Sequence, residues 1–421
     1  MPTTAGPVLI QPESAAEVAE ALRRAAAART SIVIRGAGTK NGWGRPASRI
    51  DAILDMRRLN RILAHEHGDM TATIEAGASL GDVNQALAVH GQALPLDPPF
   101  ADRATIGGLL ATNDSGPLRH RYGTPRDLVI GIQLATTDGV LAKAGGQVVK
   151  NVAGYDLAKL VTGSFGSLAA IVSATFKLAP LPAASKTMKI GVRDAGAVAD
   201  VVRTMMASQL EPVAFELATR RSTPNGQHRQ NDSHPARSAS SGCDVLIRFA
   251  SLPAVVDAQI EQAMGGLKPS TTSIDVLDGD AERSLWHAHA NELWDSPGAI
   301  LRASWLPADI APALAELERF AAAATPSPTP GVAACTTSLA GRAAIGAGHI
   351  RIDAGAGAQA AVVEQLRASP VFGNVVIVRG SPELKALVDV WGSHGDRQPL
   401  FDALKRAFDP DGVLNAGRGP L

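Results

Sequence analysis

The stretch Ser31–Gly44, SIVIRGAGTKNGWG, decides how the N-terminal part of this chain folds. Its apolar run IVI is typical of a short buried strand, and a glycine-rich turn follows directly. Gly36, Gly38 and Gly42 carry no Cβ and tolerate positive φ values, so the turn can present backbone N–H groups to an anion such as a phosphate. The same pattern also occurs in ordinary surface turns, and taken alone it leaves both interpretations open.

The turn does not fit either common nucleotide-binding motif. The GxGxxG fingerprint needs a third glycine at position 41 and a helix directly after it, whereas this chain has Asn41 followed by GWGRP. The sequence also contains no GxxxxGK[ST] run, which excludes an ordinary P-loop. The functional interpretation that remains is a diphosphate-binding turn of another architecture.

Composition excludes several classes of protein. The 421 residues include 40 Lys and Arg against 40 Asp and Glu, so the net charge is zero. We therefore do not expect the clustered positive charge that would attract nucleic acids or anionic membranes. No apolar run approaches the roughly 18 residues of a membrane span. The start of the chain, MPTTAGPVLIQPES, lacks the basic and apolar regions of a signal peptide. We therefore expect a cytoplasmic protein.

The chain has two cysteines, Cys243 and Cys335, which lie far apart in the sequence. An iron–sulfur cluster generally takes four thiolates, so this chain cannot hold one by itself. If the protein performs redox chemistry, its electrons must leave through something other than a metal cluster of its own.

Strands and helices alternate in the first third of the chain. Ser14, with Glu17 three residues later, predicts the start of a helix, and Ser79 predicts a second helix that runs to His90. Strands are expected at 31–35, 50–55 and 71–75. This alternation predicts a parallel or mixed sheet.

Two further glycine-rich regions follow the first. One is DPPFADRATIGGLLATNDSGPLRHRYG at 97–123, and the other is QVVKNVAGYD at 147–156, which leads into a helix at 156–161. Within the first, the run ATNDSG at 111–116 is small and polar throughout. A wall without bulky side chains suits a large flat ligand with a diphosphate tail. Between them, 127–137 predicts an alternating strand.

The sequence Pro180-Leu181-Pro182 predicts a domain boundary, so we expect one domain at 1–182 and another at 183–421. The second begins with alternating strands and helices over 187–324, and a similar set follows over 332–378. This pattern is typical of an α+β domain with a ferredoxin-like internal repeat. The polar, serine-rich segment 222–242 predicts a flexible surface insertion.

Three motifs occur in the order RGAGTKNG, ATIGGLLATNDSG and VVKNVAGYDLAKLVTGSFGSLAAI. Together, over about residues 7–182, they resemble the PCMH-type FAD-binding domain of the vanillyl-alcohol oxidase superfamily. The run FDPDGVLNAGR at 408–418 resembles the end of that family's FAD-linked oxidase cap domain. GPLRHRYGTPRDLVIG and KNVAGYDLAKL are most similar to the GlcE-type subunit of bacterial glycolate oxidase. The fold implied is α+β: a two-subdomain FAD-binding domain followed by an α+β cap domain.

The resemblance implies an FAD site on the residues that match its motifs. The first loop would wrap the pyrophosphate, the second would line the adenosine and the flavin, and the third would complete the isoalloxazine and ribityl pocket. The FAD-binding residues implied are Arg35, Gly36, Ala37, Gly38, Thr39, Lys40, Asn41 and Gly42 in the first loop; Pro98, Thr105, Ile106, Gly107, Gly108, Thr112, Asn113, Ser115 and Gly116 in the second; Lys150, Asn151, Gly154, Tyr155, Asp156, Gly163, Gly166 and Ile171 in the third; and Arg418 near the C-terminus.

Some members of the superfamily attach the flavin through a histidine in the first loop. This chain has Thr39-Lys40-Asn41 there. The resemblance therefore implies FAD that is bound without a covalent link.

Hydroxyacid dehydrogenases of this class resemble one another in an HxGDGNxH-like run that holds a metal near the substrate carboxylate. The corresponding stretch, GAGHIRID at 346–353, keeps one histidine, and because two imidazoles are the usual minimum we expect no metal. His349 is a candidate substrate base or ligand, and Arg351 is a candidate clamp for a carboxylate. A hydrogen-bonded structural histidine and a salt-bridged arginine are the alternatives, so the catalytic residues stay unassigned.

The resemblance implies an FAD-binding subunit of a glycolate (2-hydroxyacid) oxidase complex, which oxidises glycolate to glyoxylate. Its partners would be a GlcD-like flavoprotein subunit and an iron–sulfur subunit, through which the complex could associate with a membrane. The alternative is a non-catalytic FAD-containing structural or electron-relay subunit whose paralogous partner binds the substrate. A free-standing flavin reductase or oxidase is a third hypothesis.

Overall fold

The computed structural model describes residues 6–146, 155–219, 242–267, 271–324 and 334–420. They form two compact units: unit 1 is Met1–Leu181 together with Ser393–Leu421, and unit 2 is Pro182–Gly392. The sequence predicts a second domain that runs to residue 421, whereas the structure returns the last segment to unit 1. The reason is a pair of long-range backbone bonds, from Ile32 N to Val413 O (2.8 Å) and from Asn415 N to Ile32 O (3.0 Å).

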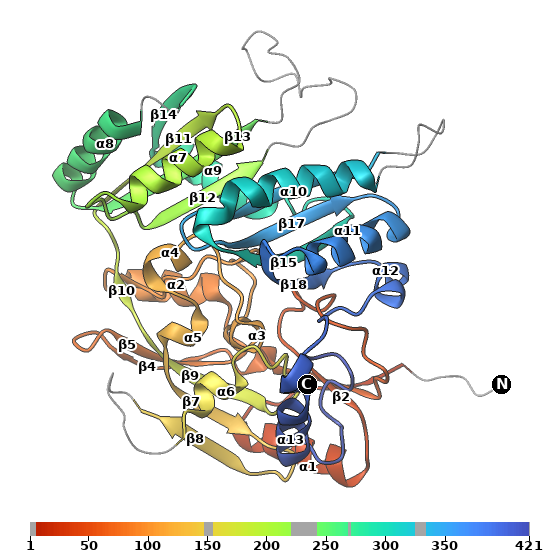
Figure 1. The fold of residues 1–421 in the computed structure, drawn as a ribbon. Coiled ribbons are helices and arrows are strands. Elements are labelled where there is room, and N and C mark those ends of the chain that lie inside the picture. The colour runs from red at the N-terminus through yellow and green to blue at the C-terminus, as the bar shows by residue number, and fades with distance from the viewer. Residues whose placement is uncertain (1–5, 147–154, 220–241, 268–270, 325–333, 421) are drawn as a thin grey trace. The chain divides into compact units, whose positions relative to one another are not determined.

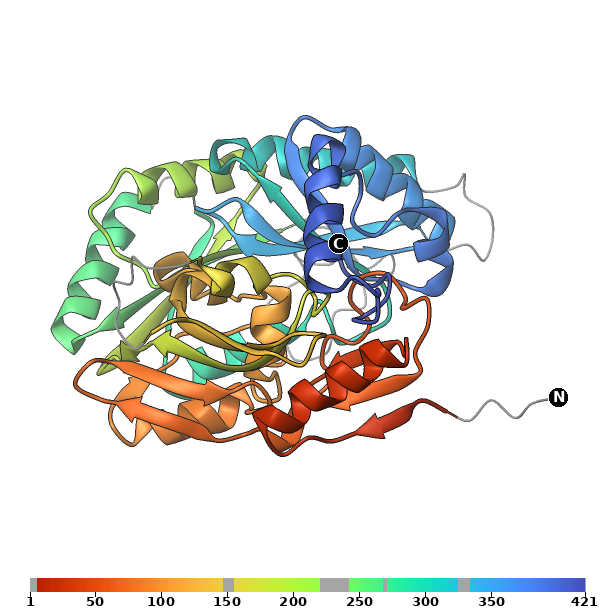
Figure 2. The same cartoon turned by 90° about the horizontal axis from the view of Figure 1, so that it is seen from below.

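Unit 1 begins with a parallel three-stranded sheet in the order β1-β3-β2, formed by Val8–Ile10, Ala52–Asp55 and Ile32–Arg35. Helix α1 (Ala15–Ala27) lies alongside it, as Figure 2 shows, and buries Val18 and Leu22 in the same core as Leu54. Its predicted start is confirmed, because Ser14 Oγ accepts a hydrogen bond from the Glu17 backbone (3.3 Å).

A second sheet of unit 1 has five antiparallel strands in the order β4-β5-β9-β7-β8 (Figure 1). Its strands are β4 (Ile62–Glu66), β5 (Thr71–Glu75), β9 (Ala170–Lys177), β7 (Val129–Ala135) and β8 (Leu141–Gly145). Other elements of unit 1 are η1 (Met56–Arg58), α2 (Leu80–Ala88), β6 (Gln92–Ala93), α3 (Ile106–Thr112), α4 (Arg119–Tyr122), α5 (Pro125–Leu128), α6 (Leu157–Val161), β10 (Ala179–Pro180), η4 (Gly395–Arg397) and α13 (Gln398–Phe408).

The strand predicted from residue 127 begins later, at Val129. Asp127 instead accepts hydrogen bonds from the backbone and hydroxyl of Thr124 (2.8 and 2.7 Å) and caps the short helix α5. A capping box at this point overrides the alternating pattern that predicts a strand.

Unit 2 contains one antiparallel sheet in the order β14-β11-β13-β12-β16-β17-β15-β18. The elements of its first half are β11 (Ala184–Val192), α7 (Ala195–Met206), β12 (Ala214–Thr219), β13 (Cys243–Ser251), α8 (Pro253–Leu267) and β14 (Ser273–Asp278). Those of its second half are β15 (Ala299–Trp305), α10 (Ile310–Ala323), β16 (Thr336–Arg342), β17 (Ala347–Asp353), α11 (Ala356–Ala368) and β18 (Phe372–Arg379). Helices α9 (Gly279–Asn291) and α12 (Pro382–Leu387) and η3 (Pro307–Asp309) complete the unit.

Each half of this sheet follows the βαββαβ order of a ferredoxin-like unit, with the spatial strand order 4-1-3-2. Figure 1 shows α7, α8, α10 and α11 along one face of the sheet. The predicted internal repeat is therefore confirmed, but the division predicted after residue 324 is wrong. The halves separate between β14 and β15, because β15 and α10 belong to the second half. The predicted insertion 222–242, apart from its last residue, lies outside the described residues. None of the helices in the described ranges combines the length and apolar character that a membrane crossing needs.

The two halves of unit 2 join where β12 pairs with β16, and Glu216 lies opposite Arg342 at this seam. Both side chains are buried, with Glu216 Oε1 3.4 Å from Arg342 Nε. On the other side, Glu216 Oε2 lies 3.0 Å from His289 Nε2 of α9. A carboxylate without contact to water thus links both repeats to α9.

Glu216→Ala is expected to lower the free energy of unfolding by about 3 kcal/mol, because it removes one partner from a buried ion pair. Urea denaturation followed by circular dichroism measures the change. Glu364→Ala, on the exposed surface of α11, is the matched control and should stay within about 0.5 kcal/mol of the parent. Equal midpoints for the two variants would contradict a structural role of Glu216.

Candidate cofactor site

The predicted glycine-rich turn follows β2 directly. Gly38 has φ of +78°, and the turn is closed by backbone bonds from Asn41 N to Gly38 O (3.1 Å) and from Trp43 N to Lys40 O (3.0 Å). At its start, Arg35 Nη2 donates to the buried carboxylate of Asp55 (3.0 Å). An ion pair therefore fixes Arg35, the last residue of β2, directly before the turn begins.

Arg418 binds the carbonyl oxygens of the turn. Its guanidinium donates to the carbonyl oxygens of Lys40 (2.9 Å), Asn41 (2.5 Å) and Trp43 (3.3 Å). Burial lowers the pKa of Arg418, although not enough to discharge a guanidinium at neutral pH. The carbonyl groups of the turn are thus occupied by one cation.

The backbone N–H groups at 36–39 show the opposite pattern. Within the part of the chain that the structure describes, these four N–H groups donate to no protein oxygen. A turn whose carbonyls are neutralised and whose amides are unpaired has the polarity that an anion requires. This arrangement supports the interpretation of the turn as a phosphate-binding loop over that of a surface turn.

A cavity in unit 1 opens beside this turn. A Cβ on Gly36 would stand 2.0 Å from Thr105 Oγ1, and one on Gly107 would stand 2.8 Å from the Cβ of Ala76. A side chain at either glycine would have to displace Thr105 or Ala76. The lining residues are Ile34, Gly36, Met56, Ala76, Thr105, Gly107, Gly108, Ala111, Phe165, Gly166, Ala169, Ile171 and Asn415. The wall is apolar and mostly small, which suits a flat ring.

Asn415 closes the cavity from the C-terminal segment. Its Nδ2 donates to Phe165 O (2.5 Å), and its Oδ1 accepts from the backbone of Ile34 (3.2 Å). It therefore ties β2 to the turn 163–166, in which Gly163 and Gly166 have φ of +85° and +69°. Sequence analysis missed Asn415 as a wall residue, because nothing local signals a contact across so many residues.

The second glycine-rich region contributes in two ways. Thr105, Gly107 and Gly108 line the cavity. Asp114 instead forms a buried ion pair with Lys40 of the first loop (Oδ2 to Nζ, 3.2 Å) and so joins the two loops. Gly116 packs against Asp97, where a Cβ would lie 1.8 Å from the backbone oxygen.

Other implied residues lie elsewhere. Pro98 and Ile106 are buried in unit 1 but are not among the cavity-lining residues. Thr112 and Asn113 hold the end of α3, through a bond from Thr112 Oγ1 to Gly108 O (2.8 Å) and a left-handed conformation at Asn113 (φ +46°). Ser115, two residues further along the chain, is buried as well.

In the third region, too, only some of the implied residues line the cavity. Ile171 and Gly166 line the cavity, whereas Tyr155 is 90% exposed. Asp156 caps α6 and pairs with Lys159 (2.8 Å). The implied residues Lys150, Asn151 and Gly154 lie outside the described residues. Met56, Ala76, Ala111 and Phe165 line the cavity without having been predicted, because apolar and small residues carry no motif of their own.

The Asp55 pair predicts a dependence of stability on pH. Burial alone would raise the pKa of Asp55, but the guanidinium groups of Arg57 and Arg35 outweigh it and hold this pKa at about 2. An unfolded Asp titrates near 3.9, so the stabilisation is complete above about pH 4 and is lost as the pH falls toward 2. Because Arg57 is half exposed, we expect the free energy of unfolding to fall by about 1 kcal/mol over this range. Urea titrations at several pH values measure the change, which should be absent in Asp55→Asn.

In unit 2, the candidate clamp Arg351 is only 2% exposed and fully engaged. Its Nε donates to the carboxylate of Asp353 (2.8 and 2.9 Å). Its Nη1 and Nη2 donate to the backbone oxygens of Leu293, Ser296 and Pro297 and again to Asp353. The guanidinium therefore has no donor left for a substrate carboxylate.

The other candidate, His349, lies on the same strand and is 5% exposed. Its ring packs edge-on against Trp294, with centroids 5.5 Å apart. The structure thus places both candidates in the interior of unit 2.

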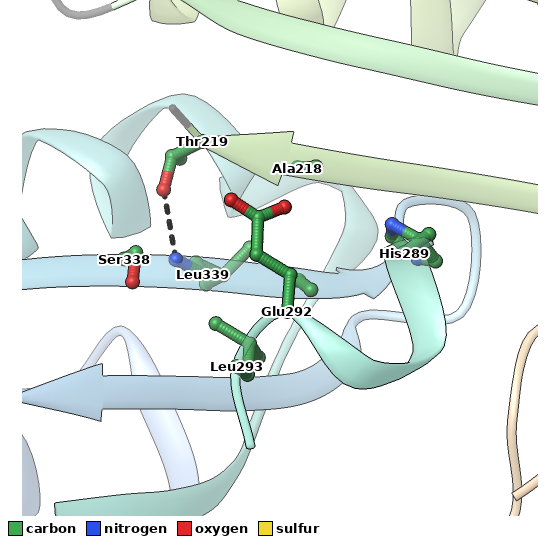
Figure 3. A pocket seen from close by; sticks show the side chains of 8 residues that line it. Ala218, Thr219, His289, Glu292, Leu293, Ser338 and Leu339 are labelled. Carbon is green, nitrogen blue, oxygen red and sulfur yellow. Dashed lines mark hydrogen bonds between the residues drawn. The ribbon is translucent and has the colours of Figure 1, made fainter. Parts of the chain in front are cut away.

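Unit 2 also contains a small pocket between β12, β16 and the end of α9 (Figure 3). Thr219, Glu292 and Ser338 line it together with His289, and Thr219 Oγ1 accepts from the Leu339 backbone (2.8 Å). Among the described residues that line it, His289 is the one side chain able to carry positive charge, and it already bonds Glu216. This described lining offers no unengaged cation to an anionic substrate.

Comparison with known proteins decides the family. Residues 7–145 match the family described as "FAD binding domain", and residues 181–341 match "FAD linked oxidases, C-terminal domain". The chain carries both domains of the FAD-linked oxidases. FAD is accordingly the cofactor of this FAD-linked oxidase, and the glycine-lined cavity with its amide-rich turn fits it.

Curated relatives agree with this family. The glycolate oxidase subunit GlcE of Escherichia coli is 36% identical over 171 residues, which are 40% of this chain and 48% of that protein. Glycolate oxidase subunit GlcD of Bacillus subtilis is 32% identical over 49% of this chain and 44% of its own length. D-2-hydroxyglutarate dehydrogenase of Xanthomonas citri is 30% identical over 67% of this chain and 58% of its own length. This FAD-linked oxidase spans about half the length of the relatives it matches.

Among solved structures, alkyldihydroxyacetonephosphate synthase has a TM-score of 0.70 at 16% sequence identity. The match covers 97% of this chain and 76% of that protein. At this identity the likeness concerns the fold, and it supports the predicted two-domain α+β architecture.

Proposed function

We propose that this FAD-linked oxidase is an FAD-binding subunit of a complex that oxidises glycolate or another 2-hydroxyacid and passes the electrons to partner subunits. The observation that carries the proposal is the turn at 36–43, whose carbonyls face Arg418 while its first amides are unpaired, beside a glycine-walled cavity. The names of the relatives supply the substrate class.

The chain's own residues would perform defined tasks toward the cofactor. The amides of 36–39 would bind the diphosphate, and Gly36, Gly107 and Gly166 leave room for the ring system. Arg418 and Asn415 hold the loops in place. When bound, FAD supplies the hydride-accepting chemistry. Thr39-Lys40-Asn41 offers no histidine for attachment, so acid precipitation should release the flavin into the supernatant, and a yellow pellet would contradict non-covalent binding.

A second candidate function is electron relay without substrate oxidation, in which a GlcD-like flavoprotein subunit binds the hydroxyacid and an iron–sulfur subunit receives the electrons. Arg351 favours this alternative, because its donors are saturated within unit 2. The pocket of Figure 3 agrees, since the described residues that line it include Glu292 and no unengaged cation.

One titration separates the two functions. The full chain is purified alone, and its visible spectrum is followed as glycolate is added without oxygen. Bleaching of the flavin identifies a catalytic chain. A yellow protein that ignores glycolate but is reduced when a GlcD-like subunit is present identifies a relay, and a colourless protein contradicts both.

Arg351→Lys tests whether this arginine binds substrate or supports the fold. Lysine has fewer donors and no planar fork, so we expect the free energy of unfolding to fall by about 2 kcal/mol. In preparations that stay folded, the KM for glycolate of any activity present should not change. A raised KM with unaltered stability would restore the clamp hypothesis.

A further inference from the structure

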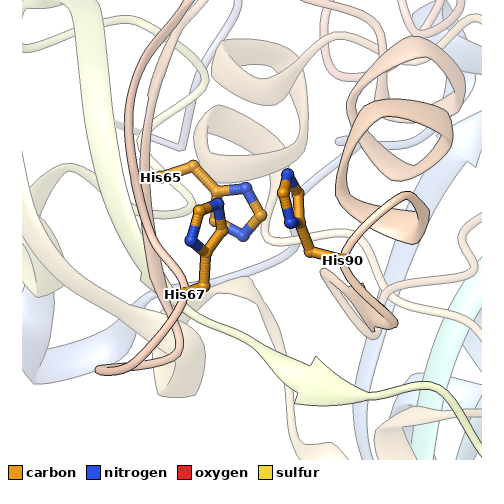
Figure 4. A group of neighbouring side chains, drawn as sticks. All are labelled: His65, His67 and His90. Carbon is orange, nitrogen blue, oxygen red and sulfur yellow. The ribbon is translucent and has the colours of Figure 1, made fainter.

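Three histidines lie close together in unit 1, and none of them is among the residues that line the cavity. His65 is on β4, His67 is in the turn to β5, and His90 follows α2 (Figure 4). One ring nitrogen from each can be chosen so that all lie within 4.8 Å of one another. The ring centroids of His67 and His90 are 3.9 Å apart, and His65 is 4.5 Å from His67 and 5.2 Å from His90.

Gln92 fixes the tautomer of His65. The buried amide of Gln92 donates from Nε2 to the backbone oxygen of His67 (2.9 Å), which turns its Oε1 toward His65 Nε2 (2.8 Å). Because Oε1 can only accept, His65 Nε2 carries the proton. Its Nδ1 therefore keeps a lone pair. A ring nitrogen that donates to an amide oxygen while the other binds a metal is the usual second contact of metal-bound histidines.

The three imidazole rings come from two separate segments of unit 1 and converge within reach of one ion. Imidazole nitrogens are ordinary ligands of zinc.

We propose that His65, His67 and His90 bind one zinc ion, with the fourth tetrahedral position open to water. Zinc–nitrogen bonds of about 2.0–2.1 Å place ligand nitrogens about 3.3 Å apart, a distance that small rotations of the exposed His67 and His90 rings can reach. The ion would fasten the β4–β5 hairpin to the segment between α2 and β6. The inference does not depend on the proposed function. It departs from the sequence-based prediction of no metal site in this chain, which was argued from 346–353.

The test uses the full chain with its FAD, after treatment with a chelator. Titration with zinc chloride in a calorimeter should show one equivalent bound with a Kd on the order of micromolar or tighter, and zinc should raise Tm. His67→Ala and His90→Ala should each weaken binding at least tenfold and abolish the rise in Tm. Both residues are exposed, so these variants should fold. Gln92→Ala should weaken binding about 10- to 100-fold.

His287→Ala, an exposed histidine of unit 2, is the matched control and should bind zinc as the parent does. Absence of stoichiometric binding to the parent would overturn the proposal. Equal affinity in the parent, His67→Ala and His90→Ala would also overturn it, since zinc would then bind elsewhere.

Discussion

Gly38→Val should yield a purified protein that retains little or no FAD. Gly38 adopts φ of +78°, a conformation that β-branched residues reach only with strain, and a Cβ there would stand 3.2 Å from Asn41 Nδ2. The turn must then rearrange, and its amides at 36–39 lose their common direction. A strain of about 3 kcal/mol corresponds to an FAD affinity about 100-fold weaker.

The flavin content of this variant is measured from its visible absorbance relative to protein, and its Kd by titration of the apoprotein with FAD. Gly265→Ala is the control, because Gly265 lies inside helix α8 and a Cβ there meets nothing within 4 Å. It should retain FAD as the parent does. If Gly38→Val purified with a full complement of flavin, the first loop would not be the diphosphate site.

Arg418→Ala should also lose FAD, by a different route. Three carbonyl oxygens of the first loop, at Lys40, Asn41 and Trp43, accept hydrogen bonds from this one guanidinium. Hydrogen bonds to charged donors contribute about 1.5–3 kcal/mol each, so we expect a loss of at least 3 kcal/mol in the free energy of unfolding. In protein that remains folded, FAD should bind at least tenfold more weakly, because the carbonyls then compete for the space that the anion needs.

Arg418→Lys should recover part of the affinity, since an ammonium supplies the charge but not the planar fork. Arg24→Ala removes an arginine that is 76% exposed on α1 and should change neither flavin content nor stability by more than about 0.5 kcal/mol. Unaltered FAD affinity in folded Arg418→Ala would show that the tail does not organise the loop.

The sequence predicts well those parts of the fold whose causes are local. Ser14 and Glu17 form the start of α1 where the pattern places it, and the alternation after residue 183 predicts both ferredoxin-like halves. Gly36 and Gly38 are identified from spacing alone: Gly38 has a positive φ, and at Gly36 a Cβ would meet the side chain of Thr105. Asp127 shows the limit of such patterns, since a cap formed three residues apart displaced the predicted strand.

Contacts between distant segments could not be predicted in the same way. Asn415 bonds strand β2 and Arg418 bonds the first loop, each across more than 370 residues, so only Arg418, through a family resemblance, entered the predicted site. The mutual approach of His67 and His90 depends on the path of the chain through β5 and α2. Arg351 illustrates the opposite case: its position on the strand suggested a clamp, but the backbone around Leu293–Pro297 takes its donors.

The measurement that tests the central claim most directly is a crystal structure of the FAD-loaded chain. The account predicts that the diphosphate accepts hydrogen bonds from the backbone N–H groups at 36–39 and that the flavin enters the cavity walled by Gly36, Gly107 and Gly166. A cofactor that lies elsewhere, with these amides bonded to solvent alone, would contradict it.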